Sequence, residues 1–295
     1  MRSMRFIIPL CLLLLFVPIY LWKVAGYWEH ESTTPVLRPD LTSKEYVLLD
    51  TTDFERGILA GIRSDDIELF ARTDVVELLR QSLIKYQKSV RGYSCTLCKQ
   101  ERIKGKLTAP EEVDVWFKDE PYSVLMHWTK GATRAAATLY VAGENDGKLC
   151  VRPHAEALKK LIGWAKRSPD SDDAKEMSRY LITESDLRSV AERTFKVWKN
   201  VRDSGATFNV QYLGLHKNLH EVGNRDCHVI KRICNPPEEE GLTEITIYID
   251  AETWIQVGSV LKVNDELLGS YWYKDIRLNP SFDDKHFKPE TLKKY

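Results

Sequence analysis

From about residue 93 to its end, the chain repeats one pattern of short segments in which apolar and polar residues alternate, separated by turn signals. In one of these segments Val113, Val115 and Phe117 occupy every second position. A period of two is typical of a strand that is buried on one face. Because such segments follow one another through short turns, the sequence predicts an antiparallel meander.

The opening strand of this meander starts at Tyr93 and runs into a Gly-Lys turn that ends at Leu107. Val124, Met126 and Trp128 share one face of the next-but-one strand. Asn145 to Gly147 and the pair Asn264-Asp265 are hairpin turn signals, because these residues tolerate positive φ. Further strands are expected at residues 139–141, 148–152, 208–213, 225–233, 242–250, 254–263 and 267–278.

Three other segments follow helical spacing. One starts after an N-cap at Thr73 or Asp74 and ends before Gly92. Residues 154–166 form a second candidate, and residues 187–201 a third, with Ser185 as its N-cap. A helix has to bury its apolar stripe, and one face of the sheet is the available surface. We therefore predict an α+β fold, in which helices pack on the concave face of a strongly curved antiparallel sheet.

The N-terminus predicts export. Arg2 and Arg5 precede an uncharged run over residues 6–22, which fits a signal anchor, with a cleaved signal peptide as the alternative. We favour an uncleaved N-terminal membrane helix, which anchors the protein in the cytoplasmic membrane with its domain in the periplasm. The expected organisation is an anchor or signal at 1–28, a linker at 29–72 and a folded domain at 73–295.

Charge and motifs exclude several function classes. Lys+Arg and Asp+Glu both number 43, and this balance argues against a nucleic-acid partner, which needs a basic surface. The sequence has no Gly-rich phosphate loop, no G-x-S-x-G and no H-E-x-x-H motif. We therefore expect no catalytic residues, no cofactor and no metal. His216 and His220 have weak metal-ligand spacing, and a solvated loop is the preferred interpretation.

Several stretches resemble a bacterial family known as domain of unknown function fifteen-seventy-one. The resemblance lies in Tyr93-x-Cys95 with Lys99-Gln-Glu-Arg-x-x-Gly-Lys-Leu107, Glu120-Pro-Tyr-Ser-Val124, Leu139-Tyr-Val-x-Gly143 with Asn145-x-Gly-Lys-Leu149, and Leu278-Asn279 with Phe287-x-Pro289 and Tyr295. That family is grouped with the LolA/LolB-like fold of periplasmic lipoprotein carriers. The resemblance implies an incomplete β-barrel with helices as a lid over an apolar cavity, and no established activity. Gln256, Cys98 and Cys234 depart from the family's pattern.

The cysteines allow more than one interpretation. Cys95-x-x-Cys98 has redox spacing, but in a strand an odd offset points the two side chains to opposite faces. A structural disulfide is favoured in an oxidising compartment, and a cross-strand bond between Cys95 and Cys227 is one such pairing. A zinc site formed by Cys95, Cys98, Cys227 and Cys234 ranks below the disulfide. The spacing between Cys227 and Cys234 is wider than that of usual zinc ligands.

One apolar face of the strands is the remaining candidate for a site. It either fills a core, which is the default for such a face and the interpretation that the residues alone favour, or lines a cavity for an acyl chain. With the family resemblance, a lipid-holding cavity becomes a real alternative to a filled core. The candidate lining residues are Val113, Val115, Phe117, Val124, Met126, Trp128, Ile245, Ile247 and Ile249.

Three functional hypotheses follow. The leading one is a non-enzymatic, exported, membrane-tethered protein that binds a lipid or a lipidated partner in an apolar half-barrel cavity. The alternative is a cell-envelope structural or protein-interaction module with a filled core. The third is a thiol-redox protein that uses Cys95 and Cys98. The oligomeric state is not predicted.

Overall fold

The computed structural model describes residues 66–295. The expected anchor at 1–28 and most of the expected linker therefore lie outside the described residues. The described end of that linker is not irregular, since Ile67–Thr73 forms helix α3. Within residues 66–295, no helix combines the length and the apolar character needed to cross a membrane.

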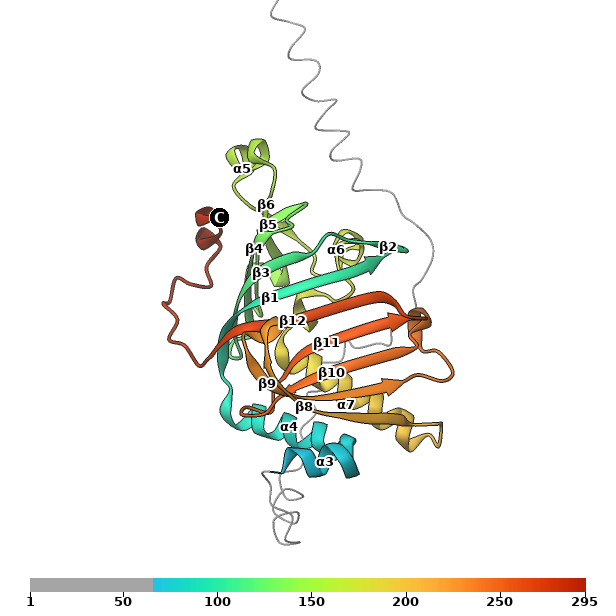
Figure 1. The fold of residues 1–295 in the computed structure, drawn as a ribbon. Coiled ribbons are helices and arrows are strands. Elements are labelled where there is room, and N and C mark those ends of the chain that lie inside the picture. Colours follow the sequence, from blue (N-terminus) through green and yellow to red (C-terminus); the bar gives the residue numbers. More distant parts are fainter. Residues whose placement is uncertain (1–65) are drawn as a thin grey trace, which may run out of the picture. The chain divides into compact units, whose positions relative to one another are not determined.

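The strands form one open, curved antiparallel sheet, as the alternation predicts (Figure 1). Its order is β7-β6-β5-β4-β3-β1-β12-β11-β10-β9-β8, with β2 paired to β1, so β7 and β8 form the two edges. The strands are β1 (Gly92–Ile103), β2 (Lys106–Leu107), β3 (Glu111–Lys118), β4 (Ser123–Lys130), β5 (Ala135–Val141), β6 (Leu149–Pro153), β7 (Ala165–Arg167), β8 (Asn209–Leu219), β9 (Arg225–Ile233), β10 (Glu244–Asp250), β11 (Gln256–Val263) and β12 (Glu266–Leu278).

The turn chemistry confirms the expected hairpins. Asn264 and Asp265, between β11 and β12, both have positive φ, at 47° and 70°. Asn145 and Asp146, between β5 and β6, have φ of 55° and 60°. Such residues match the right-handed twist of the strands they join, and this fixes the register in which the sheet forms.

Helices α4 (Val75–Ser89) and α7 (Leu187–Asp203) cover one face of the sheet, which we call the inner face. Figure 1 shows α7 behind strands β10 to β12. Asp74 caps α4 by accepting hydrogen bonds from two backbone N–H groups. The N-cap of α7 is Asp186 and not Ser185 as expected, because the Asp186 carboxylate reaches the N–H groups of Arg188 and Ser189 at 3.0 Å.

The segment between β6 and α7 departs from the single helix expected at 154–166. It forms α5 (Glu156–Ile162), the edge strand β7, α6 (Asp172–Met177) and a short 3-10 turn, η3 (Ile182–Glu184). Gly163 ends α5 in a positive-φ conformation, at 63°. A residue without Cβ adopts this geometry without strain, and the chain then turns back to pair with β6.

The C-terminal tail covers the opposite, outer face. A 3-10 helix, η6 (Pro289–Lys294), packs with Phe282 and Phe287 against the outer side chains of β4, β5 and β6. Every residue of β5 is consequently buried. This part of the sheet therefore has a cover on both faces.

Helix α3 belongs to the core and not to a linker. Phe70 packs against Trp254 with ring centroids 6.5 Å apart, in a cluster shared with α4, α7, β9 and β10. We predict that Phe70→Ala lowers the free energy of unfolding of the full-length protein by about 3 kcal/mol, through lost burial and the cavity left behind. Urea titration followed by tryptophan fluorescence measures the change.

The matched control is the neighbouring Leu69→Ala. Leu69 is 41% exposed, whereas Phe70 is 9% exposed, so we expect the control to change stability by no more than about 0.5 kcal/mol. Equal effects of the two variants would contradict the assignment of α3 to the core.

Candidate functional site

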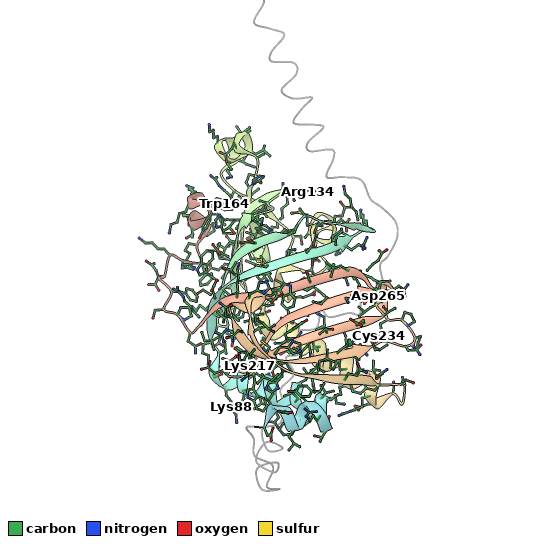
Figure 2. All side chains as sticks on the ribbon, in the orientation of Figure 1. Lys88, Arg134, Trp164, Lys217, Cys234 and Asp265 are labelled. Carbon is green, nitrogen blue, oxygen red and sulfur yellow. The ribbon has the colours of Figure 1, made fainter. Side chains whose placement is uncertain are left out.

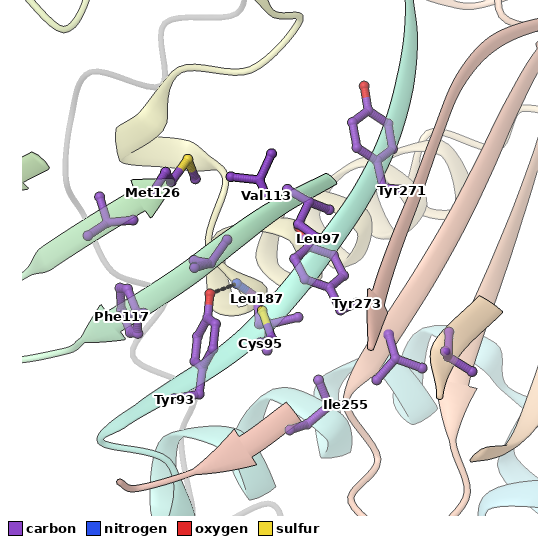
Figure 3. Packing of buried hydrophobic residues seen from close by; sticks show 14 of the residues in the cluster. Tyr93, Cys95, Leu97, Val113, Phe117, Met126, Leu187, Ile255, Tyr271 and Tyr273 are labelled. Carbon is purple, nitrogen blue, oxygen red and sulfur yellow. Dashed lines mark hydrogen bonds between the residues drawn. The ribbon is translucent and has the colours of Figure 1, made fainter. Parts of the chain in front are cut away.

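The nine candidate lining residues all lie on the inner face, but they fall in two separate clusters. The first lies on β3 and β4 and packs against β1, β11, β12 and the start of α7. In it Val113, Val115 and Phe117 are buried together with Val124 and Met126, and Trp128 is half-buried. Figure 3 shows Val113, Phe117 and Met126 of this cluster on the same side of the sheet as Leu97 and Tyr273.

The second cluster lies on β10. Ile247 and Ile249 are fully buried beneath α3, α4 and α7, with large side chains such as Trp198 above them. Ile245 is half-buried and touches both clusters. The helices therefore cover the β10 part of the inner face, and something else has to cover the β3 and β4 part.

That cover is a segment we call the strap, residues 178–185, which leads into the first turn of α7. Tyrosine hydroxyls from the sheet hold it by its backbone. Tyr122 Oη donates to Ile182 O at 3.4 Å, and Tyr273 Oη donates to Ser185 O at 3.1 Å. At its end the N–H of Leu187 donates to Tyr93 Oη at 3.1 Å, the dashed line in Figure 3. The strap is thus fixed by a few polar contacts.

The strap is a thin cover. Tyr180 and Ile182 pack on the β3 and β4 cluster, yet neither is fully buried. No described side chain between residues 151 and 185 is buried. The face beneath has almost no exposure, so a layer one chain thick shields it from water.

A buried polar cluster lies under the N-terminal end of the strap. Lys99 and Glu101, at 9% and 1% exposure, point inward from β1 and form an ion pair at 2.8 Å. Glu101 also accepts hydrogen bonds from Tyr271 Oη at 2.7 Å and from Ser178 Oγ at 3.1 Å. The backbone N–H of Arg179 donates to the same carboxylate at 3.3 Å. Glu101 therefore joins the strap to the sheet.

A second carboxylate completes this polar cluster. Glu111 lies 3.7 Å from Lys99 Nζ and accepts a hydrogen bond from the indole N–H of Trp128 at 2.7 Å. Trp128, one of the candidate lining residues, thus presents its polar edge to the cluster. One lysine faces two carboxylates, an arrangement that keeps the site polar at one end of an apolar surface.

The charges favour an ionised Glu101. Burial acts to raise the pKa of this carboxyl, but the charge of Lys99 and hydrogen bonds from Lys99, Tyr271 and Ser178 outweigh it, so its pKa lies below the ordinary value. Burial, together with the neighbouring Glu101 carboxylate, raises the pKa of Tyr271 well above its ordinary value. At neutral pH the tyrosine is therefore the donor and the carboxylate the acceptor.

Lys99 and Glu101 were quoted for the family resemblance but not assigned a role from the sequence. The signal was present in the alternation of β1, where Tyr93, Cys95 and Leu97 already face inward. Continuing that period of two places both charged residues on the inner face. Charged side chains at inward positions of a strand are the feature that identifies this cluster.

The expected Cys95–Cys227 disulfide is not formed, and both thiols are free and buried. Cys95 is paired with Val115 on the inner face, whereas Cys227 is paired with Asp250 on the outer face. Three strands also separate β1 from β9. A disulfide needs Cα atoms within about 7 Å and side chains that point toward one another, and this geometry provides neither.

The redox reading of Cys95 and Cys98 also lacks its geometry. The two side chains point to opposite faces of β1, as the odd offset predicts, since Cys95 is buried and Cys98 is half-exposed. Burial raises the pKa of both thiols, which is opposite to the shift that activates a thiolate. Among residues 66–295, no group of three His, Cys, Asp or Glu side chains is placed to hold a metal ion.

A pocket of about 330 Å³ lies away from the inner face, where the C-terminal tail meets the start of β1 and the ends of β3 and β5. None of the nine candidate residues lines it. Its walls carry both signs of charge, with Lys288 paired to Glu144 at 3.0 Å. The lining residues are Arg91, Gly92, Lys118, Pro121, Ser123, Val141, Glu144, Asn279, Pro280, Phe282, Asp283, Asp284, Phe287 and Lys288.

Comparison with protein families gives one match. The model of a family described as protein of unknown function (DUF1571) matches residues 90–295. This confirms the resemblance found between Tyr93 and Tyr295. No curated protein matches the chain.

Three solved structures illustrate the similar folds. MucB is 12% identical with a TM-score of 0.41, over 70% of this chain and 61% of its own, which is less than two thirds of MucB. The lipoprotein LppX of Mycobacterium tuberculosis is 13% identical with a TM-score of 0.40, over 71% of this chain and 97% of LppX. A LolA superfamily protein from Nitrosomonas europaea is 8% identical with a TM-score of 0.34, over 72% and 98%. These similarities say nothing about what this chain binds.

We predict that Glu101→Gln loosens the strap and lowers the free energy of unfolding by about 3 kcal/mol, because it removes one partner of a buried ion pair. The low pKa of Glu101 also implies a pH dependence. Its ionised form stabilises the fold above the unfolded-state pKa of about 4.3, and this contribution is lost as the pH falls through the folded-state value. Urea titrations of the full-length protein across the acidic range measure both effects.

Glu176→Gln is the matched control. Glu176 lies on α6, just before the strap, and forms an ion pair with Lys104 at 2.6 Å, but its side chain is 39% exposed. We expect a change of no more than about 1 kcal/mol. If the acid sensitivity of the Glu101→Gln protein equalled that of the wild type, the role given to Glu101 would be wrong.

Proposed function

The chain belongs to the family of proteins of unknown function DUF1571, and we propose that its domain holds the apolar chains of a lipid, or of a lipidated partner, on the strap-covered part of the inner face. One contrast carries the proposal. Five of the six candidate residues on β3 and β4 are buried, whereas no described side chain of the strap is. Displacing the strap would open an apolar surface without dismantling the helices.

Ligand binding offsets part of the cost of opening the strap. When it leaves the sheet, the strap gives up hydrogen bonds from Tyr122, Tyr273, Ser178 and Arg179, at about 1 kcal/mol each. It also gives up the Arg179–Glu240 ion pair and the packing of Tyr180 on Tyr271. Each buried CH₂ of a ligand contributes about 0.8 kcal/mol, so burial of about eight would return about 6 kcal/mol. Burial of a single acyl chain therefore offsets the loss of these four hydrogen bonds.

The proposed site is smaller than the one expected from the sequence. It comprises the six residues on β3 and β4, with Trp128 and the Lys99–Glu101 cluster at one end. Ile247 and Ile249 do not belong to it, because α4 and α7 would have to leave before a ligand could reach them. In this proposal no reaction is catalysed.

The location is also part of the proposal and rests on the sequence alone. Residues 1–28 tether the protein to the cytoplasmic membrane, and the domain works in the periplasm. There it meets lipids or lipidated proteins that have left the membrane.

The alternative function is that of a cell-envelope interaction module with a filled core. The observation that favours it is the packing of the inner face, in which all nine candidate residues belong to hydrophobic clusters or pack against them. In this alternative the strap never opens, and partners bind elsewhere on the surface.

A photoreactive lipid separates these functions. We expect a phosphatidylglycerol with a diazirine in its acyl chain to label the full-length protein on peptides from β3 and β4, mapped by mass spectrometry. Peptides from β10 serve as the internal control, because the helices cover them. Glu101→Gln loosens the strap and should increase the labelling, whereas Glu176→Gln should leave it unchanged.

Labelling confined to residues 1–65 or to the surface of the domain would contradict lipid binding at this site and favour the filled-core module. Labelling of β10 as strong as that of β3 and β4 would contradict the boundary drawn between the two clusters.

A further inference from the structure

Helix α5 stands apart from the rest of the fold. Figure 1 shows it projecting beyond the end of β6, clear of the sheet. None of its side chains is buried. At its C-terminal end Leu161 and Ile162 are 67% and 48% exposed, the two largest exposed fractions among the large apolar side chains of residues 66–295.

The fold itself holds this tip in shape. Arg152, on β6, donates through its guanidinium to the carbonyl oxygens of Lys159 at 3.2 Å and Gly163 at 2.5 Å. The N–H of Gly163 donates to Lys159 O at 3.2 Å. The carbonyl groups of Lys159 and Gly163, at the end of the helix, therefore have partners within the chain. These hydrogen bonds hold the end of α5 in the geometry that leaves Leu161 and Ile162 exposed.

The surroundings of the tip are basic, although the whole chain has a formal net charge of zero. Residues 152–163 contain three basic residues, Arg152, Lys159 and Lys160, and one acidic residue, Glu156. Lys159 pairs with Glu156 at 3.0 Å. Positive charge therefore exceeds negative charge around the two apolar side chains.

The size of the patch selects the kind of partner. A stable protein interface buries about 800 Å² on each partner around a central apolar cluster, and two side chains on a projecting helix supply only a fraction of that. Binding to a lipid surface does not require a buried interface of this size. Apolar side chains insert at the boundary between headgroups and acyl chains, and neighbouring Lys and Arg side chains face anionic headgroups.

We propose that the tip of α5 is a membrane-docking site, which inserts Leu161 and Ile162 into the surface of an anionic bilayer with Lys160 facing the lipid phosphates. Trp164 follows at the base of the tip, half-buried against the outer-face cluster (Figure 2). Tryptophan prefers the headgroup region, and at this place it limits how deeply the tip inserts.

Docking at the tip is independent of a ligand beneath the strap. The two surfaces share no residues, and α5 docks in the same way whether or not the strap opens. A protein with a filled core would still be brought to a membrane surface by this element.

A fluorescent reporter at the tip tests the proposal. The full-length protein carries an environment-sensitive fluorescent amino acid in place of Leu161, and for comparison in place of Leu213, which is 44% exposed on the edge strand β8. Vesicles of phosphatidylcholine with phosphatidylglycerol, some with brominated acyl chains, are added. We expect a blue shift and bromine quenching at 161 and neither at 213. Vesicles of phosphatidylcholine alone should produce a smaller response.

Charge reversal supplies the second measurement. We expect Lys160→Glu to weaken vesicle binding at the tip by at least about fivefold, from the loss of one basic charge near an anionic surface. The matched control is Lys217→Glu, at the opposite end of the fold in Figure 2, which should change nothing. The proposal would be overturned by an unshifted spectrum at 161 with anionic vesicles or by an equal response at 213. It would also be overturned by a blue shift at 161 that appears only when other proteins are added and not with lipid vesicles.

Discussion

The inner side chains of β1, β3 and β4 lie near the middle of an open sheet, and no part of the sheet folds over them as a closed barrel would. Apolar side chains in that position need a separate cover. Helices α4 and α7 provide one for β9 and β10, but the cover of β3 and β4 is the strap with the first turn of α7. The arrangement of the inner face depends on this difference between a thick cover and a thin one.

The buried charges of β1 fit the same account. A buried ion pair beside an apolar face costs free energy unless its hydrogen bonds are satisfied. Ser178 and Arg179 of the strap supply two of those bonds to Glu101. The strap therefore completes a polar cluster at one end and shields an apolar surface along its length. Opening the strap uncovers both the polar cluster and the apolar surface. An amphiphile has a polar and an apolar part that match these two surfaces.

Much of the sheet could be predicted from the sequence, because alternation and turn residues act locally. The strand Arg225–Ile233 has the bounds that its pattern predicts, and the Asn264-Asp265 turn has the expected positive φ. The disulfide prediction failed because the face on which Cys227 lies depends on register across several strands. The register is set by bulges, such as the one between Ser94 and Thr96, and these leave no clear pattern in the sequence.

The strap and the second cover of β5 could not be predicted for related reasons. Strap residues are half-buried, so they show neither the period of a strand nor that of a helix. The burial of β5 on both faces depends on where a tail far along the chain comes to rest. In contrast, the inward position of Lys99 and Glu101 could have been predicted from the sequence, because the period of two along β1 places both side chains on the inner face.

The central claim is that the strap opens independently of the sheet beneath it, and hydrogen–deuterium exchange of the full-length protein tests it most directly. A local opening that breaks only the strap contacts requires less free energy than global unfolding, which breaks the sheet and the helix packing as well. Amides of the strap, including the Arg179 N–H bound to Glu101, should exchange much faster than those of β4, and faster still once bound lipid holds the strap open. Exchange of the strap at the same rate as β4, with or without lipid, would contradict the account.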